Sequence, residues 1–452
     1  MSAADGWAKP WAEMTADERL RRRLRTWLEP GIRFASEEAE ASYGERVTRL
    51  SDAICLEKTP DRVPVPLLIA EIYPLVHAGL SAYDGMYDFT RASEAFVAFN
   101  QDFRPDAMVN LAVGTAPGKM FDLLDYRLFS WPGHGCPKDS VPQYNEAEWM
   151  LPEDYDHLID DPADFLLRRF LPRIYGAFAG LDGLGNPLEP LSMIRSTKFF
   201  SSWGRAEVIA SIERITAAAR LAAEYADRLG GVQARLLALG FPPLAGASAQ
   251  APFDLLGDYM RGTKQIAMDL FRRPDKVISA CERLAPVLLR WVLERTTHET
   301  PPCVFWPLHK GDDAHMSPDQ FRRFYWPTLR TIALGLIEEG FIPLFFAEGK
   351  MDSRLEIIAG DLPKGRTVWL LDRTDMAHAK ATLGQVAALQ GNVPLSLLQT
   401  GTPEEVRDYC RRLIELAAPG GGFLLDSGAV LHQGKSENIR AMIQAAHDYG
   451  RY

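Results

Sequence analysis

The sequence predicts an α/β protein whose parallel strands close into a barrel, and two observations carry this prediction. Short apolar runs typical of buried strands alternate with amphipathic helical segments through the C-terminal half of the chain. Strict alternation of this kind indicates a parallel sheet with helices outside it. Several such units in a row, continuing to the C-terminus, favour a closed barrel over an open sheet, although periodicity alone does not prove closure.

The individual elements follow from the same patterns. The expected strands are 62–69, 106–114, 303–311, 342–349, 367–373, 386–394 and 421–428. Strong amphipathic helices are expected over 317–340, 402–421 and 436–450. Each of these helical segments begins at Ser or Thr with an acidic residue shortly after it, which is the usual arrangement at a helix N-terminus.

Two further parts are expected around the barrel, which itself spans residues 59–452. Residues 1–58 read as an N-terminal helical extension, either an arm that packs on the barrel or an element of a dimer. Residues from about 115 to 245 are less regular and contain a long helical stretch, roughly 204–240. They are expected to form an elaborated insertion of loops and helices over the barrel mouth.

Composition narrows the class of protein. The chain has 452 residues, of which 47% are hydrophobic, and a formal net charge of −10. An acidic balance argues against a nucleic-acid partner, because neutralising phosphates requires a basic face. Five scattered cysteines suit a reducing cytoplasm, and no apolar run is long enough for a membrane span. We therefore expect a cytoplasmic protein without a membrane or nucleic-acid partner.

Four segments carry a resemblance to a known family. They are HKGDDAHMSPDQFRRFYWPTL, LLDRTDMAHAKATLG, GNVPLSLLQTGTPEEVRDYC and GGFLLDSGAVLHQGKSENIRAMIQAAHDYGRY. In composition and spacing they resemble the uroporphyrinogen decarboxylase superfamily. The resemblance implies a (β/α)8 TIM barrel with its active site at the carboxyl ends of the strands. It leaves three activities open: decarboxylation of uroporphyrinogen, methyl transfer to a thiol, and methyl transfer from a methylated substrate to a corrinoid protein.

Departures from the family pattern discriminate among these activities. The decarboxylases carry arginines that hold substrate carboxylates, but the matching segment 66–81 contains no arginine. The thiol methyltransferases hold zinc with a His-x-Cys pair and a late cysteine, which here are replaced by Phe346-Ala347-Glu348 and by Ala429. Methyl transfer from a methylated substrate to a corrinoid protein therefore remains. Three motifs resemble those of the methoxyaromatic demethylases that carry out this reaction: PLHKG (307–311), Glu348-Gly349 and WPGHG (131–135).

The sequence therefore predicts a methyltransferase of the O-demethylase type. It would move a methyl group from a methoxylated small molecule to the cobalt of a corrinoid (cobalamin) carried by a separate protein, because no convincing corrinoid-binding motif is present. The leaving oxygen needs a proton or a Lewis acid. His309 and Glu348 are the predicted acid or metal-ligand residues, and Lys310 is the predicted charge stabiliser. The sequence leaves open whether the chain forms a homodimer.

Further site residues are predicted at the mouth. The predicted substrate-binding residues are His134, Gln143 and Glu146 from the insertion, and Asp372 and Asn392 from strand ends. A zinc ion could be held by His309, Glu348 and Asp426, because nitrogen and oxygen ligands suit zinc acting as a Lewis acid.

Two alternatives compete with this function. A decarboxylase or other lyase acting on a small carboxylated substrate would work without a corrinoid, but it needs a cation cluster that the strand ends barely provide. A non-catalytic barrel that serves as a binding module is disfavoured by the ionisable residues at successive strand ends, because folding does not require them there.

Overall fold

The computed structural model describes residues 9–109, 111–112 and 114–452, and its centre is a parallel sheet of six strands in chain order. The strands are β4 (Ala245–Ser248), β5 (Cys303–Leu308), β6 (Ile342–Ala347), β7 (Val368–Leu371), β8 (Ala388–Val393) and β9 (Phe423–Ser427). Strands β6 to β9 are buried along their whole length, as expected for a parallel sheet that is covered on both faces.

Five of the seven predicted strands are present, as β5 to β9. The prediction of strands at 62–69 and 106–114 was wrong for the described residues; residues 110 and 113 lie outside them. Pro64 and Pro66 have no N–H group to donate to a neighbouring strand, and Leu67 has a left-handed φ of 50°. A regular ladder therefore cannot form along the first segment.

These two segments nevertheless continue the sheet through single backbone hydrogen bonds. Leu425 donates its N–H to the Pro64 carbonyl at 2.9 Å, and Asp106 donates to the Val65 carbonyl at 2.9 Å. Met108 in turn donates to the carbonyl of Pro242, shortly before β4, at 2.7 Å. The first segment thus lies beside β9, and the second lies beside the residues that precede β4.

Alternate residues of each strand divide between two hydrophobic clusters, as the period of two in a strand requires. On one face, the tilted rings of Trp306, Phe345 and Trp369 contact one another across neighbouring strands and pack against helices such as α14 (Pro274–Leu293) and α16 (Trp326–Glu338). The strand residues on the opposite face pack with the N-terminal helices.

The remaining C-terminal helices are α12 (Pro252–Asp254), α13 (Thr263–Arg272), α15 (Pro318–Gln320), α17 (Leu355–Asp361), α18 (Met376–Thr382), α19 (Leu395–Thr400), α20 (Pro403–Ala417) and α21 (Ser436–Tyr449).

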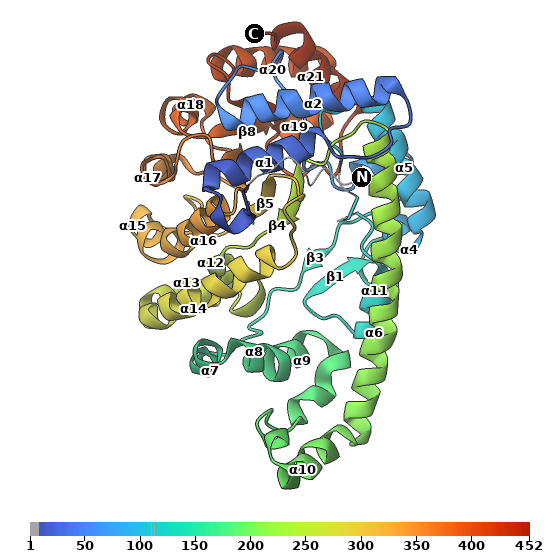
Figure 1. Cartoon of the computed structure of the whole chain (residues 1–452), viewed down its shortest axis with the longest axis vertical. Helices are drawn as coiled ribbons and strands as arrows, with labels where there is room; N and C mark the ends of the chain where they lie inside the picture. The colour runs from blue at the N-terminus through green and yellow to red at the C-terminus, as the bar shows by residue number, and fades with distance from the viewer. Residues whose placement is uncertain (1–8, 110, 113) are drawn as a thin grey trace.

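The N-terminal extension forms two helices, α1 (Ala16–Leu28) and α2 (Glu37–Cys55), which lie across the body of the molecule (Figure 1). Thr15 and Glu18 form a capping box at the start of α1. Trp27 and Leu50 are buried in the same cluster as Phe346 of β6. The extension is thus packed on the sheet of its own chain; residues 1–8 lie outside the described residues.

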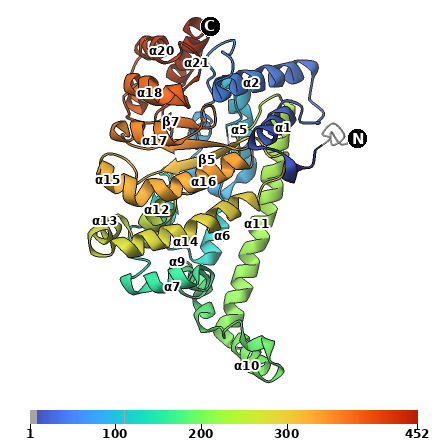
Figure 2. The ribbon, with the colours of Figure 1, turned by 60° about the vertical axis from the view of Figure 1, so that its left-hand side comes forward.

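The predicted insertion contains a small three-stranded sheet and several short helices, followed by the long helix α11 (Ala206–Ala238). Figure 2 shows α10 (Met193–Trp203) and the adjoining part of α11 standing clear of the rest of the molecule. The other elements before β4 are α3 (Tyr73–His77), α4 (Ala82–Tyr87), α5 (Phe89–Phe103), α6 (Gly118–Leu124), β1 (Phe129–Pro132), β2 (Gly135–Cys136), β3 (Gln143–Tyr144), α7 (Tyr155–Asp160), α8 (Pro162–Phe165) and α9 (Leu171–Ile174). Among the described residues, no helix combines the length and the apolar character that crossing a membrane requires.

Candidate active site

Polar side chains follow three neighbouring strands at the carboxyl edge of the main sheet. His309 and Lys310 follow β5, Glu348 follows β6 and Asp372 follows β7. The register pairs Leu308 with Ala347, and Ala347 with Leu371, so the three strands end at the same level. The sequence prediction that these residues share one edge of the sheet agrees with this register.

His309 lies between two carboxyl groups. Its Nδ1 is 2.5 Å from Oδ2 of Asp258, and its Nε2 is 3.6 Å from Oε1 of Glu348. Because Asp258 occupies one ring nitrogen, the other is directed to Glu348. The side chains of His309 and Glu348 are 30% and 42% exposed, so both are partly open to solvent.

Asp254 fixes the backbone that presents His309. It is fully buried and accepts the N–H groups of both His309 and Lys310, at 3.0 and 2.9 Å. The hydroxyl of Tyr325 also donates to Asp254, at 2.7 Å. Burial, together with the neighbouring charge of Asp258, raises the pKa of Asp254 to about 6 despite these hydrogen bonds.

The electrostatic environment favours a protonated His309. Burial alone would lower its pKa, but the hydrogen bond and charge of Asp258, followed by the charges of Asp254 and Glu348, outweigh burial and raise the pKa to about 9. Burial also raises the pKa of Glu348, and the nearby His309 partly opposes that shift. At neutral pH the cluster therefore holds an imidazolium group, which is a proton donor.

Lys310 and Glu146 are linked through one hydroxyl group. Lys310 Nζ lies 3.2 Å from Oδ1 of Asp258 and donates to Thr263 Oγ1 at 2.9 Å. Thr263 in turn donates its N–H to Glu146 at 2.6 Å and its hydroxyl at 3.1 Å. The predicted residue Glu146 of the insertion is thus joined to the cluster, in a supporting position.

Asp372 and Asn392 come together at one pocket. A cavity of about 690 Å³ is lined by both residues, together with Tyr409 and Arg412. Asp372 accepts the N–H of Gly349 at 3.0 Å, and burial raises its pKa. Gly349 has a φ of +79° and its missing Cβ would lie 2.3 Å from Asp312, so only glycine fits this exit from β6.

Three predicted residues lie apart from His309. His134 is exposed and stacks on Trp131, and exposed Gln143 donates only to the carbonyl of Val141. Asp426 is buried, and its carboxylate accepts the N–H groups of Leu68 and Ser427 and the side-chain amide of Gln390.

The predicted zinc ligands are consequently not assembled. His309 and Glu348 are neighbours, whereas the oxygens of Asp426 are already used by three donors. Within residues 9–109, 111–112 and 114–452, no group of three or more His, Cys, Asp and Glu side chains is placed to hold a metal ion. This arrangement does not fit the three-ligand zinc site predicted from the sequence.

Sequence reasoning missed Asp254, Asp258 and Tyr325. Asp254 and Asp258 lie in the segment FDLLGDYM after β4, four residues apart, which places both on one face of a helical turn. The short strand β4 has the sequence AGAS, which lacks the apolar run that would mark a strand end before these acids. The spacing of the two carboxylates was therefore the only signal available.

Comparisons with known proteins relate the C-terminal half of the chain to one family. Residues 238–449 match the model of the uroporphyrinogen decarboxylase (URO-D) family. These residues include the main sheet together with Asp254, Asp258, His309 and Glu348. Residues 238–449 of the chain are therefore similar to the uroporphyrinogen decarboxylase family.

Two particular proteins are similar to it. A uroporphyrinogen decarboxylase from Azoarcus sp. (strain BH72) is 32% identical over 102 residues, a match that covers 20% of this chain and only 28% of that protein. The structure of a methyltransferase from Methanosarcina mazei has a TM-score of 0.54 at 14% identity, covering 89% of this chain and 98% of that one. The second likeness establishes a shared fold.

Proposed function

We propose that the chain is a methyltransferase that takes a methyl group from a methoxylated small molecule, with His309 as the proton donor. The observation that carries the proposal is the position of His309 between Asp258 and Glu348, with a pKa raised to about 9 mainly by Asp258 against the effect of burial. A methoxy oxygen that loses its methyl group leaves as an alkoxide or phenolate. Protonation by an adjacent imidazolium lowers the energy of that leaving group.

The proton path uses residues of this chain only. As the methyl–oxygen bond breaks, its electron pair stays on the oxygen, which takes the proton from Nε2 of His309. Asp258 remains bonded to Nδ1 and stabilises the charge on the ring. Glu348, on the Nε2 side, helps to hold the proton there before the reaction and can return one from solvent afterwards.

The methyl acceptor is proposed to be a corrinoid on a separate protein, which would supply the nucleophile for the methyl carbon. The fold shared with the Methanosarcina mazei methyltransferase supports a methyl-transfer reaction of this kind. The methoxylated substrate, a cytoplasmic location and a homodimer belong to the same proposal. Only two of the three predicted zinc ligands, His309 and Glu348, lie together, and metal analysis of the purified protein tests whether zinc binds there.

We also propose that the sheet closes into the (β/α)8 barrel that the resemblance to the uroporphyrinogen decarboxylase superfamily implies. The single hydrogen bonds from Leu425 to Pro64, from Asp106 to Val65 and from Met108 to Pro242 support closure, with 62–69 and 106–114 taking the places of two strands. In such a barrel His309 and Glu348 lie at the carboxyl end, where barrel enzymes have their active sites.

A decarboxylase acting on a small carboxylated substrate is the second candidate, supported by the family match. The charge of the cluster disfavours it. Asp254, Asp258, Glu348 and Asp372 provide four carboxyl groups against the two cations His309 and Lys310, and Lys310 is already paired with Asp258. A negatively charged substrate would meet a surplus of carboxyl groups.

The experiment is an anaerobic assay of the full chain with free cob(I)alamin and a panel of methoxybenzoates. Loss of cob(I)alamin absorbance and appearance of the free phenol are expected, and His309→Gln should lower kcat by about 10²- to 10⁴-fold. His157→Gln is the matched control, because His157 also pairs with an aspartate, Asp164 at 2.8 Å, but lies in the insertion. Carbon dioxide release from small carboxylic acids without a corrinoid would overturn the proposal in favour of the decarboxylase.

A further inference from the structure

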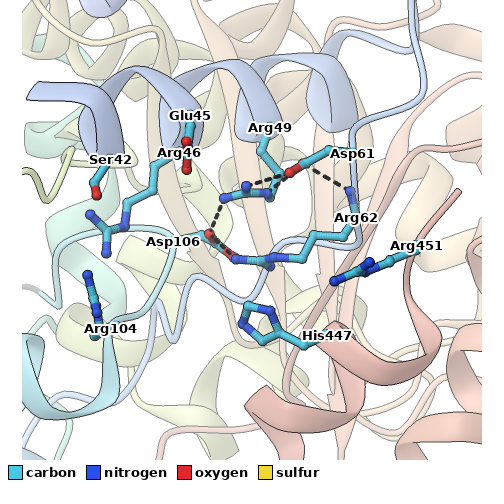
Figure 3. A pocket seen from close by; sticks show the side chains of 10 residues that line it. All are labelled: Ser42, Glu45, Arg46, Arg49, Asp61, Arg62, Arg104, Asp106, His447 and Arg451. Atoms are coloured by element: carbon cyan, nitrogen blue, oxygen red, sulfur yellow. Dashed lines mark hydrogen bonds and ion pairs between the residues drawn. The ribbon is translucent and has the colours of Figure 1, made fainter. Parts of the chain in front are cut away.

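A second pocket, unlike the site around His309, is dominated by arginine. It has a volume of about 570 Å³ and is built by α2, by the residues around Arg104 and Asp106 that follow α5, and by the C-terminal end of α21. Figure 3 shows its lining, which is Ser42, Glu45, Arg46, Arg49, Asp61, Arg62, Arg104, Asp106, His447 and Arg451. None of these residues belongs to the cluster around His309.

Two of the arginines are committed to carboxylates. Arg49 donates to Asp61 at 2.7 and 2.6 Å and to Asp106 at 2.8 Å. Arg62 donates twice to the same Asp106, at 2.8 Å each. Asp106 is buried and also accepts the N–H of Val65 at 2.7 Å. This network has an evident structural role, because it ties α2 to the segment at 62–65.

The other three arginines keep free donors. Arg46 is 7% exposed and donates one N–H to the carbonyl of Gly240 at 2.7 Å, which leaves further N–H groups unused. Arg104 has only a long contact of 3.4 Å with exposed Glu38. In the part of the chain that the structure describes, the guanidinium of Arg451 makes no hydrogen bond or ion pair. In Figure 3, Arg46 and Arg104 face each other, and Arg451 lies beside Arg62.

The pocket therefore has unbalanced positive charge. Five guanidinium groups line it, against the three carboxyl groups of Glu45, Asp61 and Asp106, and this leaves an excess of two positive charges. Burial lowers the pKa of His447 most, and the positive charge of Arg62 lowers it further. Burial also lowers the pKa of Arg46; the charge of Asp106 opposes this shift, and the charges of Arg104, Arg49 and Arg62 add to it.

Like charges gathered in a pocket repel one another, and folding alone does not require three arginines beyond those that pair with Asp61 and Asp106. A bound oxyanion would relieve the repulsion, because the planar guanidinium group matches phosphate and carboxylate oxygens with two parallel hydrogen bonds. We propose that this pocket binds a small multivalent oxyanion, a phosphate ester or polycarboxylate, between Arg46 and Arg104, which face each other at one end of it. This site is separate from the proposed methyl-transfer chemistry and does not depend on it.

The test is calorimetric titration of the full chain with inorganic phosphate, pyrophosphate and citrate at constant ionic strength. Saturable binding of one equivalent is expected, tighter for pyrophosphate than for phosphate. Preference for pyrophosphate over citrate indicates a phosphate-bearing ligand, and the reverse indicates a polycarboxylate. Arg104→Gln should weaken binding about tenfold, the loss expected for one charge-assisted hydrogen bond of about 1.4 kcal/mol, whereas Arg451→Gln, at the other end of the pocket, should weaken it less.

Two further variants sharpen the result. Glu45→Gln removes an exposed carboxylate from the lining and should tighten binding, an effect that loss of folding cannot produce. Arg411→Gln is the matched control, because Arg411 is a half-exposed arginine of α20 outside the pocket, and its affinity should equal that of the wild type. No saturable binding of any of the three anions, or wild-type affinity in Arg104→Gln, would overturn the proposal.

Discussion

Several histidines of this chain lie near an aspartate, but their environments differ. His157 contacts Asp164, and His315 contacts Asp312, each through one ring nitrogen. Among the described residues, only His309 has a carboxylate near both nitrogens, Asp258 and Glu348. One carboxylate fixes the orientation of the ring, and the other faces the nitrogen that is left for chemistry. This double contact distinguishes a candidate proton donor from a histidine that only stabilises a loop.

The pH dependence of turnover should follow His309. Its role as an acid requires the protonated ring, so kcat should stay level at neutral pH and fall as the pH rises through about 9. Because the folded-state pKa is raised above its usual 6.5, the group's stabilising contribution is also fully present below pH 6.5 and is lost as the pH rises through about 9.

The dependence of kcat on pH also tests whether Asp258 positions the His309 ring and sets its pKa. In Asp258→Asn the carboxylate charge is lost, and the alkaline limb of kcat should move to lower pH, together with a lower maximal kcat. The measurement is kcat against pH for both proteins. An alkaline limb at the same pH in both would show that Asp258 does not set the ionisation of His309.

Elements with strong local signals were predicted well from the sequence. The long helix α11 was expected at 204–240 and spans Ala206–Ala238, and Thr402 begins α20 with the expected acid three residues later. Segment 62–69 was assigned as a strand because it is apolar, but Pro64 and Pro66 prevent a ladder along it. Apolar composition reports burial, whereas hydrogen bonding decides whether a buried segment is a strand.

Part of the candidate site was predicted from the sequence, because some of its residues follow strands that have a strong local pattern. His309, Lys310 and Glu348 stand directly after long apolar strands, so their position at the sheet edge could be inferred. Asp258 lies ten residues after the short strand β4, and its contact with His309 joins two separate βα units. Such tertiary contacts leave no local pattern in a single sequence.

The N-terminus of α20 provides a quantitative test of local stability. The Thr402 side chain accepts the N–H of Glu405, and the Glu405 side chain accepts the N–H of Thr402, at 3.3 and 2.8 Å. Thr402→Ala should therefore lower the free energy of unfolding by about 1 kcal/mol. Thr331→Ala, at an exposed position inside α16, should be neutral or slightly stabilising because alanine favours helix. Chemical unfolding of both variants checks this; equal destabilisation would count against a role for the cap.

The insertion is held to the rest of the molecule by buried charge. Asp269 of α13 is 1% exposed and accepts hydrogen bonds from Tyr155 at 2.9 Å, from Arg261 at 2.6 Å and from Arg273 at 3.1 Å. Arg261, also 1% exposed, pairs with Glu148 at 2.6 Å as well. Tyr155 and Glu148 belong to the insertion, whereas Asp269 precedes the core helix α14. Since Lys310 is connected to Glu146 through Thr263, the attachment also borders the candidate active site.

Removing this central carboxylate should loosen the insertion from the sheet. Asp269→Ala leaves the buried Arg261 with its charge incompletely paired, and such losses cost about 3–5 kcal/mol. We expect a lower unfolding temperature and faster proteolysis within the insertion. Asp275→Ala is the matched control, because Asp275 is 95% exposed and its contact with Arg323 is 3.8 Å long, so stability should change little. If Asp269→Ala unfolds at the control's temperature and resists protease equally, apolar packing around Tyr155 is sufficient to hold the insertion in place.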